Sequence, residues 1–207
     1  MAQIKTVEAL RDRLGNPHTL TQQKIYDHLF EEAVAFIGRA PLAFMATVSG
    51  EGEPTVSPKG DGPGFVRVEG TDTLLVPERP GNKLAHGLTN IIETGKIGLI
   101  FLIPGMEETL RVNGTCVLDD DAALCADMAA RGQDAVLVMH VSVEECFFHC
   151  AKAFKRSQTW TPDSWPEPIS ISFGDIIARN AGGNKVKQKA VEIAVNQSVK
   201  LDYKKNL

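Results

Sequence analysis

Between residues 42 and 148 the sequence consists mainly of short apolar-rich segments separated by turns that contain glycine or proline. Several of these segments alternate apolar with polar side chains, as strands with one buried face do. Such short strands at close spacing favour antiparallel pairing, and closing the sheet hides its edges. We therefore expect a mainly β protein of the α+β class, built on an antiparallel barrel. The predicted strands are residues 42–49, 55–61, 65–68, 73–76, 96–103, 109–118 and 136–148.

Helical patterns flank these strands on both sides. Val7, Leu10 and Leu14 recur at helical spacing before a Gly-Asn-Pro stop, and a second helix is predicted over residues 21–37. Shorter helices are expected at residues 83–93, after the aspartates at 119–121, and at 149–157. After residue 172 a helix is expected up to a Gly-Gly pair, followed by a second through Val195 and a basic, mobile end.

The chain is long enough for one domain with a real core, since it has 207 residues of which 43% are apolar. We expect a single domain over residues 1–207, with a helical segment at 1–40, a barrel at 41–160, and a loop and helical tail at 161–207. A net charge of −4 argues against a nucleic-acid surface. Without a signal-peptide pattern or a run long enough to span a membrane, the expected location is the cytoplasm. The four cysteines are too scattered for a disulfide framework and are expected to be reduced.

Two predicted strands end in cationic turns within residues 54–84, and both turns are typical of ligand sites. In the first, alternation places Ser57 and Lys59 on one face and Val56 and Pro58 on the other. A hydroxyl and an ammonium that face the same way can hold the polar edge of a ring. The alternative interpretation is that Lys59 is a solvated charge at the rim.

The second turn has the features of a phosphate site. Pro80 and Gly81 end the strand, and Asn82 is a suitable N-cap for a helix that starts at Lys83. A helix start offers unpaired N–H groups and a partial positive charge, to which Arg79 and Lys83 add two full charges. Here too, solvated rim charges are the alternative.

Other chemistries find weaker support. Cys146, His149 and Cys150 invite a zinc interpretation, but the strand pattern places His149 on the opposite face from the two cysteines, so buried thiols are favoured. The aspartates at 119–121 point in different directions on a helix, and we predict no metal site. The glycine-rich turn at 60–64 matches neither a P-loop nor a dinucleotide fingerprint. No serine or cysteine stands in a motif with a histidine and an acid, so hydrolysis is unsupported.

Four ordered motifs resemble the FMN-binding split-barrel proteins related to pyridoxamine 5'-phosphate oxidase. They are SPKGD at 57–61, PER-PGN at 77–82, LIPG-x-x-ETLRVNG at 102–114 and HC-x-KAF-x-RS-x-x-W at 149–160. The resemblance is to an uncharacterised FMN-dependent branch of that family. It implies a split antiparallel β-barrel with flanking N- and C-terminal helices, which forms a homodimer with FMN at the subunit interface.

The resemblance also implies which residues contact FMN. Ser57 and Lys59 would lie along the isoalloxazine, Arg79 with Asn82 and Lys83 would hold the phosphate, and Thr109 and Arg111 would approach the ring or ribityl chain from an inward strand face. Lys152, Arg156 and Ser157 match the motif that closes the site, often from the other subunit; a solvated helix face is the alternative. The full set of expected cofactor contacts is Thr55, Val56, Ser57, Pro58, Lys59, Arg79, Asn82, Lys83, Thr109, Arg111, Lys152, Arg156 and Ser157.

Two departures from the family's oxidase set this chain apart from it. Arg-Lys-Gly at the phosphate turn is replaced by Arg79-Pro80-Gly81, and the closing Arg-x-His-x-Arg substrate motif is absent. We therefore expect an FMN-dependent oxidoreductase that acts on another small molecule, with no catalytic residue assigned, because the flavin carries the electrons. Lys59 is the residue expected to stabilise negative charge on the reduced ring. A non-catalytic flavin carrier or sensor is the alternative, and deazaflavin or haem are alternative cofactors, with His140 or His149 as the source of a haem ligand.

Overall fold

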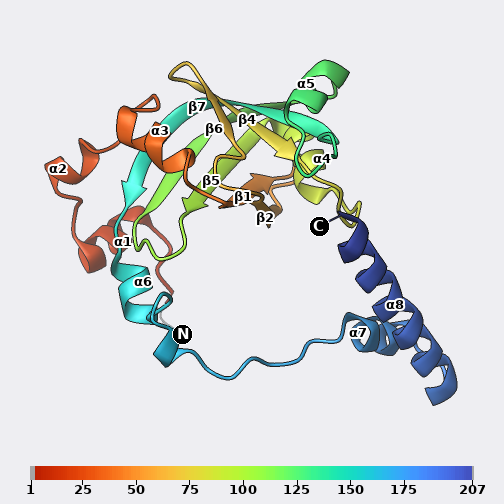
Figure 1. Ribbon diagram of the computed structural model, residues 1–207. Helices are drawn as coiled ribbons and strands as arrows, with labels where there is room; N and C mark the ends of the chain where they lie inside the picture. Colours follow the sequence, from red (N-terminus) through yellow and green to blue (C-terminus); the bar gives the residue numbers. More distant parts are fainter. Residues whose placement is uncertain (1–2, 207) are drawn as a thin grey trace. The chain divides into compact units, whose positions relative to one another are not determined.

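The chain forms two compact units in the computed structural model, which describes residues 3–206 (Figure 1). The first unit ends at Trp160 and contains all of the strands, and the second starts at Thr161 and is helical. The single domain expected over residues 1–207 stays a prediction.

The first unit is built on one seven-stranded sheet with the order β2-β1-β5-β6-β7-β4-β3, and every neighbouring pair is antiparallel. This arrangement confirms the predicted α+β split barrel with flanking helices. The strands are β1 (Leu42–Val48), β2 (Pro54–Gly60), β3 (Arg67–Glu69), β4 (Thr73–Glu78), β5 (Lys96–Leu102), β6 (Thr109–Asp119) and β7 (Leu137–His149).

Alternating residues of these strands form the core on the inner face of the sheet. Leu99 of β5 lies beside Met45 of β1 and Val112 of β6, and each of the three side chains is at most 1% exposed. Burial of such a side chain contributes about 1.5–3 kcal/mol relative to leaving it in water. The apolar run of β5 predicts burial on both faces, but Gly98 and Ile100 on its other face are only half-buried.

The sheet is irregular between Asn113 and Gly114, where its register with β7 shifts by one residue. A Cβ atom on Gly114 would lie 2.0 Å from the carbonyl oxygen of Ser142. Only glycine therefore allows β6 and β7 to approach this closely.

The predicted helix over residues 21–37 is wrong. The chain forms α1 (Val7–Leu14), the short α2 (Thr19–Gln22) and α3 (Glu31–Ile37), with non-helical backbone between the last two. Tyr26 exchanges two backbone hydrogen bonds with Cys146 of β7, of 3.0 and 2.7 Å, and Leu29 N donates to Thr71 O over 2.6 Å. These bonds to other segments replace the helical ones.

Three further helices connect the strands: α4 (His86–Thr94), α5 (Ala122–Asp127) and α6 (Lys152–Ser157). Asp121 caps α5 by accepting a 2.9 Å hydrogen bond from Leu124 N, as its position in an acidic triplet predicts. α5 covers the outer face of β4 and β7, where Leu75, Met128 and Val138 form a second, smaller core. His149, predicted as the start of a helix, is instead the last residue of β7.

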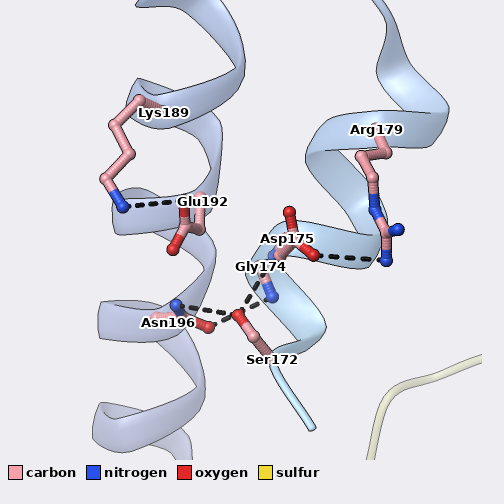
Figure 2. A network of polar contacts seen from close by, with 7 residues as sticks. All are labelled: Ser172, Gly174, Asp175, Arg179, Lys189, Glu192 and Asn196. Atoms are coloured by element: carbon pink, nitrogen blue, oxygen red, sulfur yellow. Dashed lines mark hydrogen bonds and ion pairs between the residues drawn. The ribbon is translucent and has the colours of Figure 1, made fainter. Parts of the chain in front are cut away.

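The second unit consists of a 3₁₀ turn (η1, Pro162–Ser164) and two helices, α7 (Phe173–Ala181) and α8 (Lys185–Asn206). The helix predicted to stop near Val195 thus continues to Asn206. Gly174 lets the two helices touch, because a Cβ there would lie 2.4 Å from Glu192 O. Figure 2 shows the polar contacts at this crossing, where Asn196 accepts from Gly174 N over 3.1 Å and donates to Ser172 Oγ over 3.4 Å.

Candidate functional site

The alternation predicted for β2 is confirmed by its pairing with β1. Ser57 lies opposite Met45 and Lys59 opposite Ala43, whose side chains belong to the core, so both polar residues face the interior with Thr55. All three are half-buried. Val56 and Pro58 are exposed on the outer face.

Lys59 forms an ion pair with Glu78, the last residue of β4. The two side chains are only 13% and 19% exposed. Because β2 is one edge of the sheet and β4 lies next to the other edge, this pair joins the two sides of the curved sheet. The pair therefore helps to close the barrel, and it neutralises the first predicted cation.

Arg79, directly after β4, is also bound to a carboxylate. Its Nε donates to Asp61 Oδ2 over 2.8 Å, and its Nη1 donates to Met128 O over 2.8 Å. Arg131 Nη2 lies 3.2 Å from the other oxygen of Asp61, which also accepts from Gly62 N over 2.9 Å. Two guanidinium groups thus share one carboxylate, which leaves the cluster with one net positive charge.

Arg131 reaches Asp61 from a strained position. Its φ angle is 52°, in the left-handed region that costs a non-glycine residue roughly 1–3 kcal/mol. The tight turn at Ala130 and Gln133 holds it there with two reciprocal backbone hydrogen bonds of 2.9 and 3.0 Å. Strain of this kind often accompanies ligand sites.

A pocket of about 340 Å³ opens beside the Arg79 cluster. One wall is the Gly62-Pro63-Gly64 turn after β2, and the opposite wall is the end of α5. Arg67 lies at the rim, where its Nη1 is 2.6 Å from Asp127 Oδ2. This pair is more exposed than the Arg79–Asp61 pair, with 37% of Arg67 and 64% of Asp127 open to solvent.

The predicted helix start at Lys83 is wrong, and Asn82 is not its N-cap. Lys83 and Ala85 both adopt left-handed backbone conformations, with φ of 61° and 53°, so α4 begins only at His86. Asn82 Oδ1 instead accepts a 3.0 Å hydrogen bond from Leu84 N within the turn. Sequence spacing identified the breaker but not the extra left-handed residues.

The start of α4 nevertheless lies beside β2. A Cβ on Gly87 would lie 3.9 Å from Ser57 Oγ, and no side chain caps the first turn of this helix. Its free N–H groups and partial positive charge favour an anionic group in this region.

Thr109 and Arg111 lie on the opposite face of the sheet from Ser57 and Lys59. Their neighbours Leu110 and Val112 face the core with 0% exposure, so the inward orientation expected for Thr109 and Arg111 is wrong. Thr109 is buried, with only 7% of its surface exposed. The Arg111 guanidinium lies 5.6 Å from the centre of the Phe147 ring. These contacts hold Arg111 on the outer face.

His149 ends β7 opposite Thr109. Desolvation lowers the pKa of its imidazole below the ordinary value, and the positive charges of Arg111 and Lys24 lower it further.

The three residues expected on α6 lie on or next to its exposed surface. Lys152 and Arg156 are four residues apart on this helix and therefore share a face, as predicted. Ser157 Oγ donates to Phe154 O over 3.2 Å and contacts Thr159 Oγ1 at 2.5 Å. Their roles as cofactor contacts stay predictions.

The thirteen predicted residues therefore form two groups in one chain. The first group, on β2 and just after β4, contains the five residues from Thr55 to Lys59 together with Arg79, Asn82 and Lys83. The second group, on the outer face of β6 and on α6, contains Thr109, Arg111, Lys152, Arg156 and Ser157. A phosphate fits the net positive Arg79 cluster, whereas the Lys59–Glu78 pair has no net charge.

Sequence reasoning missed the acidic partners and one cation of the first group. Glu78 stands beside Arg79 and Asp61 lies two residues from Lys59, so each cationic turn carries its own carboxylate in the sequence. That signal was readable. No sequence signal indicated Arg131, because it lies in a turn that is distant in sequence from both cationic turns.

Across residues 3–206 no group of three or more His, Cys, Asp or Glu side chains is arranged to hold a metal ion. None of the helices in that range has the length and apolar character needed to cross a membrane.

The sequence model of the pyridoxamine 5'-phosphate oxidase family matches residues 29–150. Among proteins with curated functions, none matches the chain significantly.

Solved structures that resemble the chain include HupZ from Group A Streptococcus, which is 23% identical, with a TM-score of 0.48 over 58% of this chain and 93% of HupZ. A candidate pyridoxamine 5'-phosphate oxidase from Lactobacillus delbrueckii is 26% identical, with a TM-score of 0.47 over 59% and 95% of the two chains. An FMN-binding protein from Syntrophomonas wolfei is 12% identical, with a TM-score of 0.46 over 70% and 97%.

Proposed function

Because this chain belongs to the pyridoxamine 5'-phosphate oxidase family, we propose that it binds FMN and acts as an FMN-dependent oxidoreductase on a small molecule. When bound, the flavin supplies the electron transfer at its N5 atom, and the protein binds and orients it. Such a site needs no catalytic acid or base from the protein.

The net positive Arg79 cluster is the observation that carries the proposal. The pocket beside it is lined by Arg79 and Arg67 and by their carboxylate partners Asp61 and Asp127. Arg131, which binds the same carboxylate as Arg79, adds the one positive charge without a counter-ion that favours a phosphate here. Charge-assisted hydrogen bonds of this kind are the strong ones, and arginine suits the geometry of a phosphate. Ser57 and the uncapped start of α4 would add neutral donors nearby.

A homodimer is part of the proposal. Thr109, Arg111 and the cations of α6 lie away from the Arg79 cluster, so a site that uses both groups is incomplete within one chain. A second copy can supply the outer-face group to the Arg79 cluster of the first. We expect a dimer by light scattering after size-exclusion chromatography, and a monomer that still binds FMN fully would contradict this part.

Titration with flavins tests the cofactor assignment. We expect FMN to bind more tightly than riboflavin, because riboflavin lacks the phosphate that the Arg79 cluster holds. Arg79→Met should remove most of this difference, which we expect to be about tenfold or more since one charged hydrogen bond contributes roughly 1.5–3 kcal/mol. Arg39→Met, which changes an exposed arginine outside this cluster, is the matched control.

Reduction of the bound flavin tests the activity. NAD(P)H or another small donor should reduce the protein-bound FMN faster than free FMN. Bound FMN that no donor reduces would favour a non-catalytic flavin carrier, and wild-type protein that stays colourless with added FMN at micromolar concentration would contradict the proposal as a whole.

A further inference from the structure

Lys59 and Arg79 differ in how much of their positive charge is left for a ligand. Asp61 is 6% exposed and is shared by two guanidinium groups and a backbone N–H, so its cluster keeps one net positive charge. Lys59 has one carboxylate partner, Glu78, and that pair has no net charge.

The Lys59–Glu78 pair lies where electrostatic effects are strong. Both side chains are more than four-fifths buried, and their strands form opposite sides of the barrel closure. In such surroundings the effective dielectric constant is well below that of water, so each charge acts more strongly on its neighbours than it would in water. A group close enough to interact with the positive charge of Lys59 therefore also interacts with the negative charge of Glu78.

We propose that Glu78 sets the charge that the protein presents to the flavin ring, by cancelling Lys59. This inference rests on the proposed function and assigns a role to a residue outside the expected cofactor contacts. Glu78 acts through Lys59 and is a positioning residue. The ring subsite, which is the part of the proposed site where Ser57 and Lys59 would lie along the isoalloxazine, is then neutral, while the Arg79 cluster supplies the net positive charge for the phosphate.

A neutral ring subsite favours the oxidised flavin, whose ring carries no charge, over the reduced flavin, whose ring can carry a negative charge. Lys59 without its counter-ion would favour the reduced form. Glu78 thus keeps the midpoint potential of bound FMN lower than Lys59 alone would set it.

Glu78→Gln is the direct test, because glutamine keeps the size and a hydrogen-bond acceptor for Lys59 but removes the negative charge. We expect the variant to bind reduced FMN at least tenfold more tightly relative to oxidised FMN, which corresponds to an increase in midpoint potential of about 30 mV for two electrons. The potential is measured by reductive titration with dithionite in the presence of a reference dye.

The double variant Lys59→Met/Glu78→Gln separates this role from a structural one. With both charges removed, the subsite is neutral again, so the potential should return close to that of the wild type. Glu69→Gln, at an exposed end of β3, is the matched control and should leave the potential unchanged. If Glu78→Gln does not fold, Glu78→Asp is the substitute test. It keeps the negative charge but moves it away from Lys59, so its potential should lie between that of the wild type and that expected for Glu78→Gln.

The outcomes distinguish the inference from the proposed function. Wild-type protein that binds no FMN overturns both. Wild-type protein that binds FMN, together with an unchanged potential in Glu78→Gln, overturns the role of Glu78 and leaves the proposed function intact. A double variant whose potential stays as high as that of Glu78→Gln shows that the effect does not pass through Lys59 and also overturns the inference.

Discussion

Arg79 donates from Nε to Asp61 Oδ2 over 2.8 Å, and so connects the residue after β4 to the turn after β2. The Lys59–Glu78 pair joins the same two strands two residues earlier in β2 and one residue earlier in β4. Each side of the sheet therefore supplies one cation and one carboxylate, Lys59 and Asp61 from the β2 side and Arg79 and Glu78 from the β4 side. The end of the barrel is thus held by charged groups, with the candidate site built into its closure.

Asp61→Ala should destabilise the protein by about 3–5 kcal/mol, because it leaves two guanidinium groups without their shared, largely buried carboxylate. Denaturant unfolding of the ligand-free chain measures this change. Asp127→Ala is the control, since its more exposed pair with Arg67 should contribute no more than about 1 kcal/mol. Equal effects of the two substitutions would contradict the role of Asp61 in closing the barrel.

Gly114→Ala should destabilise the barrel by about 3 kcal/mol or more, because the new Cβ would lie 2.0 Å from Ser142 O and the strands would have to separate. Gly50→Ala tests an ordinary glycine, since its Cβ would meet nothing closer than 3.7 Å. Thermal unfolding of both variants gives the comparison. A Gly114→Ala protein as stable as the wild type would mean that the shifted register between β6 and β7 is not formed.

Cys150 should be the only cysteine that reacts with iodoacetamide in the folded protein at pH 8. Cys150 is exposed and the other three are buried. Burial raises the pKa of Cys116 to about 12 and that of Cys146 to about 11, so both stay protonated and unreactive at this pH. Mass spectrometry should find one label on the folded chain, four after denaturation, and none on folded Cys150→Ser. Early labelling of Cys116 or Cys146 would contradict their burial.

Arg111→Met should raise the pKa of His149, because a nearby positive charge opposes protonation of the imidazole. Lys24→Met should raise it less, since Lys24 is the weaker of the two charges. NMR titration of the imidazole protons measures both. In the wild type the lowered pKa means that the folded chain binds this proton less readily than the unfolded chain, so His149 makes stability fall as pH drops through 6.5. A pKa that Arg111→Met leaves unchanged would show that burial alone lowers it.

The strands could be predicted from the sequence because their alternation is a local property. The period-2 pattern of β2 correctly separated Ser57 and Lys59 on one face from Val56 and Pro58 on the other. The helix over residues 21–37 failed because Tyr26 bonds to Cys146, a residue too distant in sequence for any local pattern to indicate. The same holds for Arg131, whose partner Asp61 lies seventy positions earlier.

The candidate site was harder to predict than the fold because it depends on which face is inside. The pattern of β6 separates Thr109 and Arg111 from Leu110 and Val112, but a pattern does not say which set faces the core. In the structure Leu110 and Val112 face the core, and so Thr109 and Arg111 lie on the outer face. The choice of Asn82 as a helix cap failed for a different reason, since Lys83 and Ala85 adopt backbone conformations that few residues of their types adopt.

The unequal lengths of α7 and α8 have a consequence for the end of the chain. Asn196 of α8 contacts the first turn of α7, so the remaining ten residues of α8 extend past the point where its partner helix begins. Within residues 161–206, this last stretch exposes 69% of Leu201 and 54% of Tyr203. Shortening the chain to end at Gln197 should therefore leave the crossing at Gly174 intact, and an affinity tag or a fluorophore can be attached at this new end.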